Sequence, residues 1–211
     1  MRAVAGILII VLKTMVLATD PSPLQITVLY EALCSDCMKL FTQVLSKFGP
    51  ALPRFAHIEL VPYGNAKRTE AYGMQQFQCQ HGPQECVMNT FHSCAIHVLN
   101  NEARSLAFVT CLEEGRWKEL DNHYTVSECF RFLRVSPDEQ SQIWSCMVNG
   151  LGIQLQEKMA RITESVRPEK HTSVPWIVIN GVSTKAMQLQ QDHLFQLFCL
   201  RYRGHIRPPG C

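Results

Sequence analysis

Two cysteines separated by two residues, Cys34 and Cys37, carry the clearest chemical signal in this sequence. They stand where a short apolar segment runs into an amphipathic one. At the N-terminus of a helix, unpaired backbone N–H groups favour the thiolate of the first cysteine. This arrangement suits thiol–disulfide exchange, in which one thiolate attacks a foreign disulfide and its neighbour releases the product. Half of a zinc site or a structural bridge uses the same spacing, so the pair alone leaves three alternatives open.

The segments on either side of the pair predict a strand followed by a helix. Apolar residues alternate from Leu24 to Tyr30, which is the period of a strand. Gly49 and Pro50 predict the end of the helix. Between the pair and this stop, apolar residues recur at helical spacing and predict one buried stripe: Cys37, Leu40, Phe41, Val44, Leu45 and Phe48. Strand, Cys-x-x-Cys and helix in this order are typical of the start of a thioredoxin-like redox domain.

The rest of the chain predicts a helical insert and then a return to strands. Residues 56–63 predict a second strand, and a cysteine-rich, mainly helical insert covers about 75–170. Within the insert Pro83 predicts a helix start, with a buried face formed by Val87, Phe91, Cys94, Ala95 and Val98. Residues 173–181 predict a strand that ends in an Asn-Gly hairpin turn, and a closing helix follows.

Pro175 stands directly before that predicted third strand. Proline lacks a donor and is tolerated at the end of a strand, so the position has a plain structural explanation. In thioredoxin-like folds, however, a cis-proline at this place lies against the cysteine pair. We therefore predict a cis bond between Val174 and Pro175, and we expect Val174, Pro175 and Trp176 to face a substrate.

The N-terminus predicts a secretory signal peptide over residues 1–18, which leaves 19–211 as a single domain. Its loss removes Arg2 and Lys13 and leaves 18 basic and 18 acidic residues, so nothing indicates nucleic acid as a partner. A membrane span needs ~20 apolar residues. No stretch approaches that length, and we expect no membrane anchor.

Ten cysteines behind a secretory leader predict disulfides. Five residues with ligand-type side chains crowd into a short segment and raise zinc as an alternative: Cys79, His81, Cys86, His92 and Cys94. Because secreted cysteines usually oxidise, we expect no metal. In a helix Cys86 and Cys94 would lie ~12 Å apart along the axis, which is too far for a disulfide.

On sequence proximity alone we expect Cys129 to pair with Cys146, and Cys199 with Cys211. Cys211, the last residue printed, has an alternative to the bond with Cys199. It could instead bond to another copy of the chain and give a disulfide-linked homodimer.

The segment from Cys79 to Cys94 follows the pattern C-Q-H-G-x-x-E-C-x-x-N-x-x-x-x-C. Its fixed positions are Cys79, Gln80, His81, Gly82, Glu85, Cys86, Asn89 and Cys94. With this signature the chain resembles the gamma-interferon-inducible lysosomal thiol reductase (GILT) family. The likeness extends to further segments, which are Leu60–Ala66, Cys111–Glu114, Val174–Trp176, Asn180–Gly181 and the spacing of Cys199 and Cys211.

The resemblance implies an α/β (α+β) chain of thioredoxin-like fold, with a disulfide-stapled helical insertion between the second and third strands. It implies reduction of protein disulfides in an acidic endolysosomal compartment, with Cys34 as the attacking thiol and Cys37 as the resolving one. No cofactor is expected beyond an external small-thiol reductant. The signature residues are expected to be structural and to hold the insert against the redox face. Two alternatives remain, a non-catalytic secreted disulfide-stapled binding protein and a disulfide isomerase or oxidase.

Two features depart from the family pattern. Asp36 lies inside the cysteine pair, where its negative charge should raise the pKa of the Cys34 thiol. The sequence also contains no Asn-x-Ser/Thr acceptor for N-linked sugar, on which lysosomal sorting would depend. A lysosomal and an extracellular destination within the secretory pathway therefore both stay open.

Overall fold

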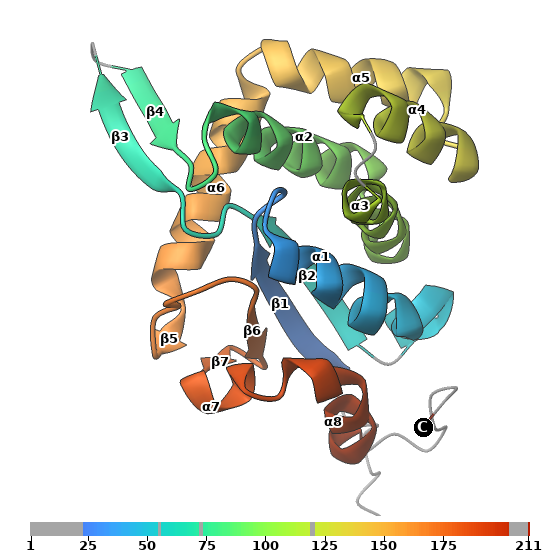
Figure 1. Ribbon diagram of the computed structural model, residues 1–211, viewed down its shortest axis with the longest axis vertical. Coiled ribbons are helices and arrows are strands. Elements are labelled where there is room, and N and C mark those ends of the chain that lie inside the picture. The colour runs from blue at the N-terminus through green and yellow to red at the C-terminus, as the bar shows by residue number, and fades with distance from the viewer. Residues whose placement is uncertain (1–22, 55, 72–73, 119–120, 203–210) are drawn as a thin grey trace, which may run out of the picture.

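The computed structural model describes residues 23–54, 56–71, 74–118, 121–202 and 211; the predicted signal peptide lies outside them. A five-stranded sheet in the order β2-β1-β6-β7-β5 forms the centre of the molecule (Figure 1). Its strands are β1 (Leu24–Tyr30), β2 (Ala56–Pro62), β5 (Arg167–Pro168), β6 (Trp176–Ile179) and β7 (Val182–Ser183). β1 runs parallel to β2 and antiparallel to β6. The first two strands and the one after the insert thus lie side by side, as the predicted order requires.

The helix that follows the cysteine pair begins with α1 (Ser35–Lys39). It continues through a π-helical segment (Leu40–Val44) and a 3₁₀ segment (Leu45–Arg54). Gly49 interrupts this last segment with a φ of 55°, so the chain leaves helical geometry where the sequence predicts the stop. The predicted apolar stripe is buried throughout, with Cys37, Leu40, Phe41, Val44, Leu45 and Phe48 all below one tenth exposed. This buried stripe fixes the helix, and with it the cysteine pair, against the sheet.

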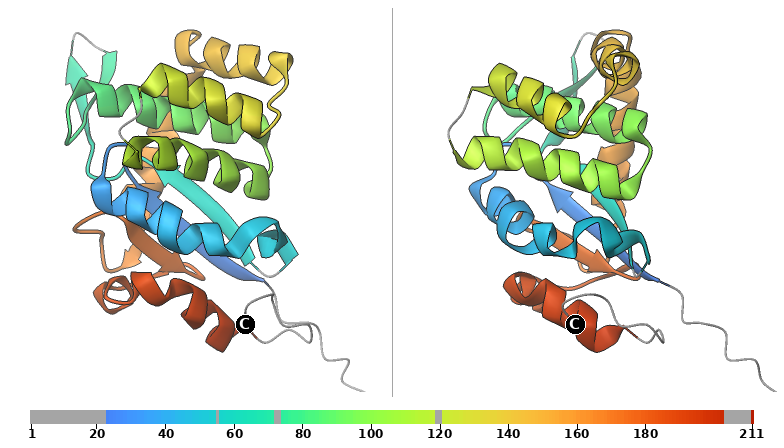
Figure 2. Two further views of the ribbon diagram at one scale, coloured as in Figure 1. Left: turned by 45° about the vertical axis from the view of Figure 1, so that its right-hand side comes forward. Right: turned by 90° about the vertical axis from the view of Figure 1, so that its right-hand side faces the viewer.

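Between β2 and β6 the chain forms a hairpin and then five helices, and Figure 2 shows the green and yellow helices stacked together above the sheet. The hairpin strands are β3 (Lys67–Ala71) and β4 (Met74–Gln78), and the helices are α2 (Pro83–Leu99), α3 (Glu102–Trp117), α4 (Asn122–Phe132), α5 (Pro137–Val148) and α6 (Leu151–Ser165). The sequence did not predict the hairpin. Residues 67–70 are exposed and mostly polar, so β3 lacks the alternation that reveals a half-buried strand.

Helix α2 begins at Pro83 as predicted. Its predicted apolar face is wrong in one position, because Val87 is 49% exposed. Polar residues of the signature, Glu85 and Asn89, are buried instead. The side of α2 that faces the first strand therefore carries hydrogen-bonding groups, which a hydrophobic pattern cannot show.

Apolar residues on the two faces of the sheet belong to different core clusters. On β1, Val28 packs with the cysteine pair and Phe41 in one cluster, whereas Leu29 packs with Trp176 and other residues on the opposite face. The second face is covered in part by α6. A third cluster fills the space among the helices of the insert, with Phe91, Phe108, Leu112, Phe130 and Ile143 among its members.

Four disulfides connect Cys79–Cys86, Cys94–Cys146, Cys111–Cys129 and Cys199–Cys211. The Cys199–Cys211 pairing is confirmed, and Cys86 and Cys94 indeed do not bond to each other. The expected Cys129–Cys146 bond is wrong, because packing pairs α2 with α5 and α3 with α4. The interchain role expected as an option for Cys211 is also not what the structure shows, since its sulfur is bonded within the chain.

The chain closes with three short helices below the sheet in Figure 1: α7 (Lys185–Gln188), a 3₁₀ segment (Gln191–His193) and α8 (Leu194–Arg201). Leu194 and Phe198 of α8 pack on the same face of the sheet as the cysteine pair. Within the described ranges no helix has both the length and the apolar character needed to cross a membrane.

Candidate active site

Cys34 is the N-cap residue of α1 and has extended backbone angles, φ −82° and ψ 119°. Its sulfur accepts a hydrogen bond from the backbone N–H of Cys37 at 3.1 Å. The same sulfur lies 3.7 Å from the carbonyl oxygen of Val174. Both Cys34 and Cys37 are free thiols. The first cysteine is therefore held at the N-terminus of a helix, where unpaired N–H groups favour its anion.

The two thiols differ in exposure. Cys34 retains 7% of its surface and Cys37 retains none. The attacking thiol is therefore not openly accessible. Cys34 is nevertheless the member of the pair that a substrate sulfur can approach.

The two thiols also differ in acidity. Hydrogen bonding with the Cys37 thiol lowers the pKa of Cys34, burial opposes this, and the backbone N–H groups of Cys37 and Asp36 add to the lowering. For Cys37 the pKa shifts in the opposite direction: burial raises its pKa, and its interaction with Cys34 raises it further. Cys34 is thus the thiolate of the pair, and Cys37 holds its proton until Cys34 is no longer an anion.

Asp36 does not act on Cys34 as the sequence suggested. Its side chain is 68% exposed and pairs with Lys39 at 3.0 Å on the outer side of α1. Only its backbone N–H is among the groups that shift the pKa of Cys34, and it lowers that pKa. The acid that raises the pKa of Cys34 is Glu31, which lies in the loop before the cysteine.

The peptide bond between Val174 and Pro175 is cis, as predicted. Val174 is half-buried, and its carbonyl contacts Cys34. Trp176 does not face a substrate: it is 1% exposed, donates from its indole nitrogen to Ser183 Oγ at 2.8 Å and packs on the other face of the sheet. Because side chains alternate along a strand, the residue after Pro175 must point away from the cysteine pair.

The signature residues connect the insert to the loop that precedes Cys34. The Asn89 side chain accepts a hydrogen bond from the Ala32 N–H at 2.9 Å. Asn65, which follows β2, donates from its side chain to Gln80 at 2.7 Å. The Cys79–Cys86 bond closes the turn in which Gly82 adopts a φ of 87°. These contacts place the start of α2 beside the redox pair.

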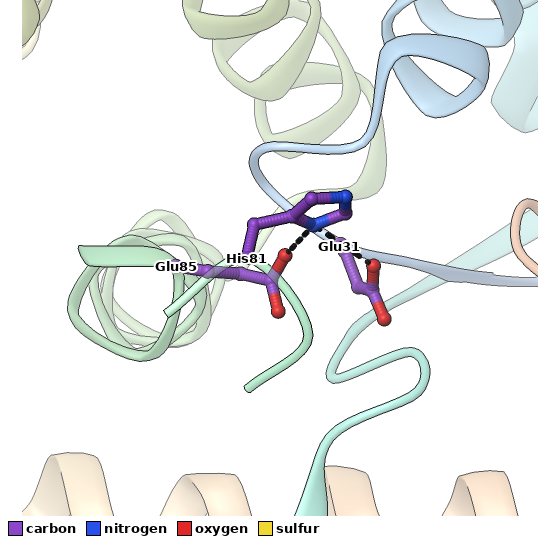
Figure 3. A group of neighbouring side chains, drawn as sticks. All are labelled: Glu31, His81 and Glu85. Atoms are coloured by element: carbon purple, nitrogen blue, oxygen red, sulfur yellow. Dashed lines mark hydrogen bonds and ion pairs between the residues drawn. The ribbon is translucent and has the colours of Figure 1, made fainter. Parts of the chain in front are cut away.

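Three side chains form what we call the outer cluster: Glu31, His81 and Glu85 (Figure 3). Both carboxylates are fully buried, whereas the His81 side chain is 41% exposed. His81 Nδ1 is hydrogen-bonded to Glu85 and lies 3.6 Å from Glu31 Oε2. The backbone N–H of Asn65 donates to the other oxygen of Glu31. The ligand-type atoms of these three side chains all lie within 4.8 Å of one another. One imidazole and two carboxylates are ligands that some divalent metal ions bind. Here, however, His81 Nδ1 is hydrogen-bonded to Glu85.

A second group, the inner cluster, consists of Tyr30, His92 and Glu113 and is at most 1% exposed. The Tyr30 hydroxyl and His92 Nδ1 are hydrogen-bonded at 3.1 Å. Burial lowers the pKa of His92 to about 3 and raises the pKa of Glu113 well above its ordinary value. The two side chains lie 4.0 Å apart but do not form an ion pair near pH 7, since His92 is neutral there and burial favours the neutral form of Glu113.

Comparison with known proteins identifies the family. The family model described as "Gamma interferon inducible lysosomal thiol reductase (GILT)" matches residues 25–133, a segment that contains the cysteine pair and the complete signature. The chain is 32% identical over 194 residues to the gamma-interferon-inducible lysosomal thiol reductase of Carassius auratus, covering 91% of this chain and 73% of the relative. The chain belongs to the GILT family.

The corresponding mouse (Mus musculus) GILT protein is 30% identical over 191 residues, covering 90% of this chain and 72% of that protein. Among solved structures, MdbA of Actinomyces oris, described as a thiol-disulfide oxidoreductase, aligns with a TM-score of 0.56 at 13% identity and covers 86% and 83% of the two chains. DsbA of Xylella fastidiosa aligns with a TM-score of 0.51 at 16% identity, covering 83% and 84%. The structural likeness confirms the thioredoxin-like fold with its helical insertion. As a GILT family member, the protein is an oxidoreductase that acts on sulfur groups.

The sequence did not single out Glu31 or Glu113 of this GILT chain as site residues, and His92 entered only as part of a zinc alternative. Glu31 does leave a trace in the sequence, because it is a charge inside an otherwise apolar run that leads to Cys34. Glu113 leaves less, because it stands on a helix next to a second glutamate and nothing in the sequence shows which of the two is buried. Their importance comes from the packing of the insert against the end of β1.

Proposed function

We propose that the protein reduces disulfide bonds of protein substrates. The Cys34 thiolate attacks one sulfur of the substrate disulfide, forms a mixed disulfide and releases the other sulfur as a thiolate that takes up a proton. Cys37 then loses its proton and attacks the Cys34 sulfur. The substrate leaves with two thiols, and Cys34 and Cys37 are left as a disulfide.

One observation carries this proposal: a free thiol of lowered pKa caps a helix, and a buried thiol of raised pKa stands three residues later. This asymmetry separates an attacking group from a resolving group. A static structural bridge would need no such difference. An oxidase or isomerase would use the same pair, and the redox potential would distinguish them from a reductase.

The proposed cycle consumes two electrons for each substrate disulfide, so an external reductant must restore the pair. We propose a small thiol, of which two molecules give up their protons and electrons and leave as a disulfide. Within the secretory pathway we propose the lysosome or the extracellular space as the site of action. The names of the relatives support the first, and the lack of an N-glycosylation acceptor supports the second.

Cys34→Ser and Cys37→Ser test the proposal in an insulin-disulfide reduction assay at pH 5 and pH 7. Cys34→Ser should reduce the rate to background, because no nucleophile remains. Cys37→Ser should also lose turnover but should accumulate a mixed disulfide, visible as a covalent adduct on a non-reducing gel. Ser35→Ala, an exposed change between the two thiols, is the control. Wild-type rates for both cysteine variants at both pH values would refute the proposal.

A further inference from the structure

The outer cluster is built into the turn that carries Cys34. The Cys34 N–H donates to the backbone carbonyl of Glu31 at 3.3 Å, so the acid and the thiol are the two ends of one tight turn. Gly64 packs directly against the Glu31 side chain, because a Cβ there would stand 2.7 Å from the Glu31 carboxyl carbon. Together with the Asn65 N–H, this leaves the carboxylate little freedom to move away from the redox pair.

The charges around this turn come from several elements. Glu31 is faced by Glu85 of α2, by His81 of the preceding loop and by Cys34 itself. Cys34 is in addition close enough to His81 for its anion to raise the pKa of that imidazole. From the interior, Cys37 of α1 and Glu113 of α3 also act on or respond to Cys34. Burial raises the pKa of both of these groups and favours their neutral forms, so we assign the change of charge to the outer cluster.

We propose that the outer cluster couples the ionisation of Cys34 to pH. On acidification it gives up negative charge beside the sulfur, so that the attacking thiolate persists where an isolated thiol would be protonated. Glu31 and His81 are positioning residues in this view, because they act on Cys34 and do not touch the substrate disulfide. The inference deepens the proposed function and rests on it for its biological meaning.

The direction of the effect follows from the two titrations. Burial raises the pKa of Glu31 to about 7, with Glu85 adding to the rise and the Asn65 N–H and His81 opposing it. The hydrogen bond to Glu85 raises the pKa of His81 above its ordinary value. Below pH 7 Glu31 therefore loses its charge, and the raised pKa of His81 means that this side chain is positive at pH 5. Both steps favour the anion of Cys34, since a like charge raises a thiol pKa and an opposite charge lowers it.

The contacts of the cluster fit a titrating group better than a purely structural one. Glu31 Oε2 is buried and has no hydrogen-bond partner among the described residues, so the ionised carboxylate is only partly satisfied. A proton on this oxygen removes that cost. His81, the partly exposed member, connects the buried carboxylates to solvent and gives the proton a route.

Glu31→Gln tests the coupling in the full chain with its four disulfides intact. The readout is the rate of Cys34 alkylation by iodoacetamide between pH 4.5 and pH 8, assigned by mass spectrometry. Because glutamine imitates the protonated acid, the variant should match the wild type near pH 5. Near pH 7.5 it should react about three- to tenfold faster, equivalent to a Cys34 pKa lower by up to about one unit. Asp36→Asn is the matched control, with the same loss of charge on a side chain that faces Lys39, and should follow the wild-type curve.

His81→Gln provides the opposite test and is safer for folding because the side chain is partly exposed. It removes the cation, so alkylation should slow several-fold near pH 5, where the raised pKa of His81 keeps the wild-type imidazole charged. Superimposable curves for Glu31→Gln and wild type, or a larger shift in Asp36→Asn, would overturn the inference. If Glu31→Gln does not fold, the His81→Gln curve decides. Alkylation measures the Cys34 anion without turnover, so failure here leaves disulfide reduction untouched, and failure of the reduction assay leaves these curves unchanged.

Discussion

The outer and inner clusters each contain a histidine close to a carboxylate, but the pKa of the histidine is shifted in opposite directions in the two clusters. Each places a histidine and a carboxylate of the insert against one of two consecutive residues at the end of β1, Glu31 for the outer cluster and Tyr30 for the inner. In the outer cluster the histidine is partly exposed and paired with a carboxylate, and its pKa is raised. In the inner cluster the histidine is completely enclosed and its pKa falls to about 3. Exposure and pairing, not residue type, decide which cluster changes its charge.

The difference assigns separate tasks to the two sides of the cysteine pair. The outer cluster stands beside Cys34, and burial raises the pKa of its Glu31 to about 7. The inner cluster acts on Cys37, and burial favours the neutral forms of its His92 and Glu113, which limits the negative charge that the buried thiol faces. A site that must ionise one thiol and keep its neighbour protonated benefits from this separation.

Disulfides hold the two clusters in different ways, and removing them should produce the largest effects. Replacing Cys94 and Cys146 by alanine opens a loop of 52 residues around the helices that carry the inner cluster, and should cost about 4 kcal/mol of unfolding free energy. Replacing Cys79 and Cys86 by alanine opens a loop whose ends are 7 residues apart in the sequence and which carries His81 and Glu85 of the outer cluster. This change should cost about 2 kcal/mol of unfolding free energy. Urea unfolding with the redox pair alkylated measures both.

The same two variants sharpen the comparison beyond stability. Loss of Cys79–Cys86 should flatten the pH dependence of Cys34 alkylation, because it loosens the turn that holds His81 against Glu85. Loss of Cys94–Cys146 should leave that profile in place in the molecules that remain folded. The reverse assignment would show that the division into two clusters is wrong.

Gly64→Ala should give the next largest loss of stability, and it should disturb only the outer cluster, through Glu31. A left-handed φ of 58° costs an alanine about 1 kcal/mol, and displacement of the Glu31 side chain should add about 1–3 kcal/mol. Gly150→Ala is the matched control: it also has left-handed backbone angles, φ 90° and ψ −15°, but a Cβ there meets nothing within 4 Å, so only the backbone cost applies. Thermal unfolding measures both variants. Equal losses would mean that Glu31 is not held by Gly64.

The redox pair, its strand and its helix could be predicted from the sequence because each depends on local rules, whereas the cis bond before Pro175 was predicted from the analogy with thioredoxin-like folds. The alternation in Leu24–Tyr30, the stripe from Cys37 to Phe48 and the stop at Gly49 specify these elements without any knowledge of their partners. Family resemblance then supplied the fold.

What could not be predicted depends on how the helices pack. The partners of Cys129 and Cys146 follow from which helices lie side by side, and sequence distance misled us there. Buried acids are also difficult to foresee, since carboxylates are rarely enclosed and no spacing rule marks Glu31 or Glu113 as exceptions. Trp176 was placed on the wrong face because the prediction did not apply the alternation of side chains along a strand, which turns the residue after Pro175 away from the cysteine pair.

His92→Gln tests the neutral character of the inner cluster, with a smaller and pH-dependent effect. The unfolded chain protonates this histidine below pH 6.5, whereas the folded protein does not until about pH 3, so the wild type should lose stability as the pH falls. Between pH 7 and pH 5 this amounts to about 2 kcal/mol. Glutamine cannot take up the proton, so the variant should lose about 2 kcal/mol less than the wild type over that interval in urea unfolding.

His81→Gln is the matched partner and should deviate in the other direction. The raised pKa of His81 means that its protonation stabilises the fold below pH 6.5, and this contribution disappears as the pH rises through the folded value. The variant should therefore lose slightly more stability than wild type on acidification, by less than the His92 effect because the side chain is partly in water. If the two glutamine variants deviated in the same direction, burial and pairing would not be what distinguishes the clusters.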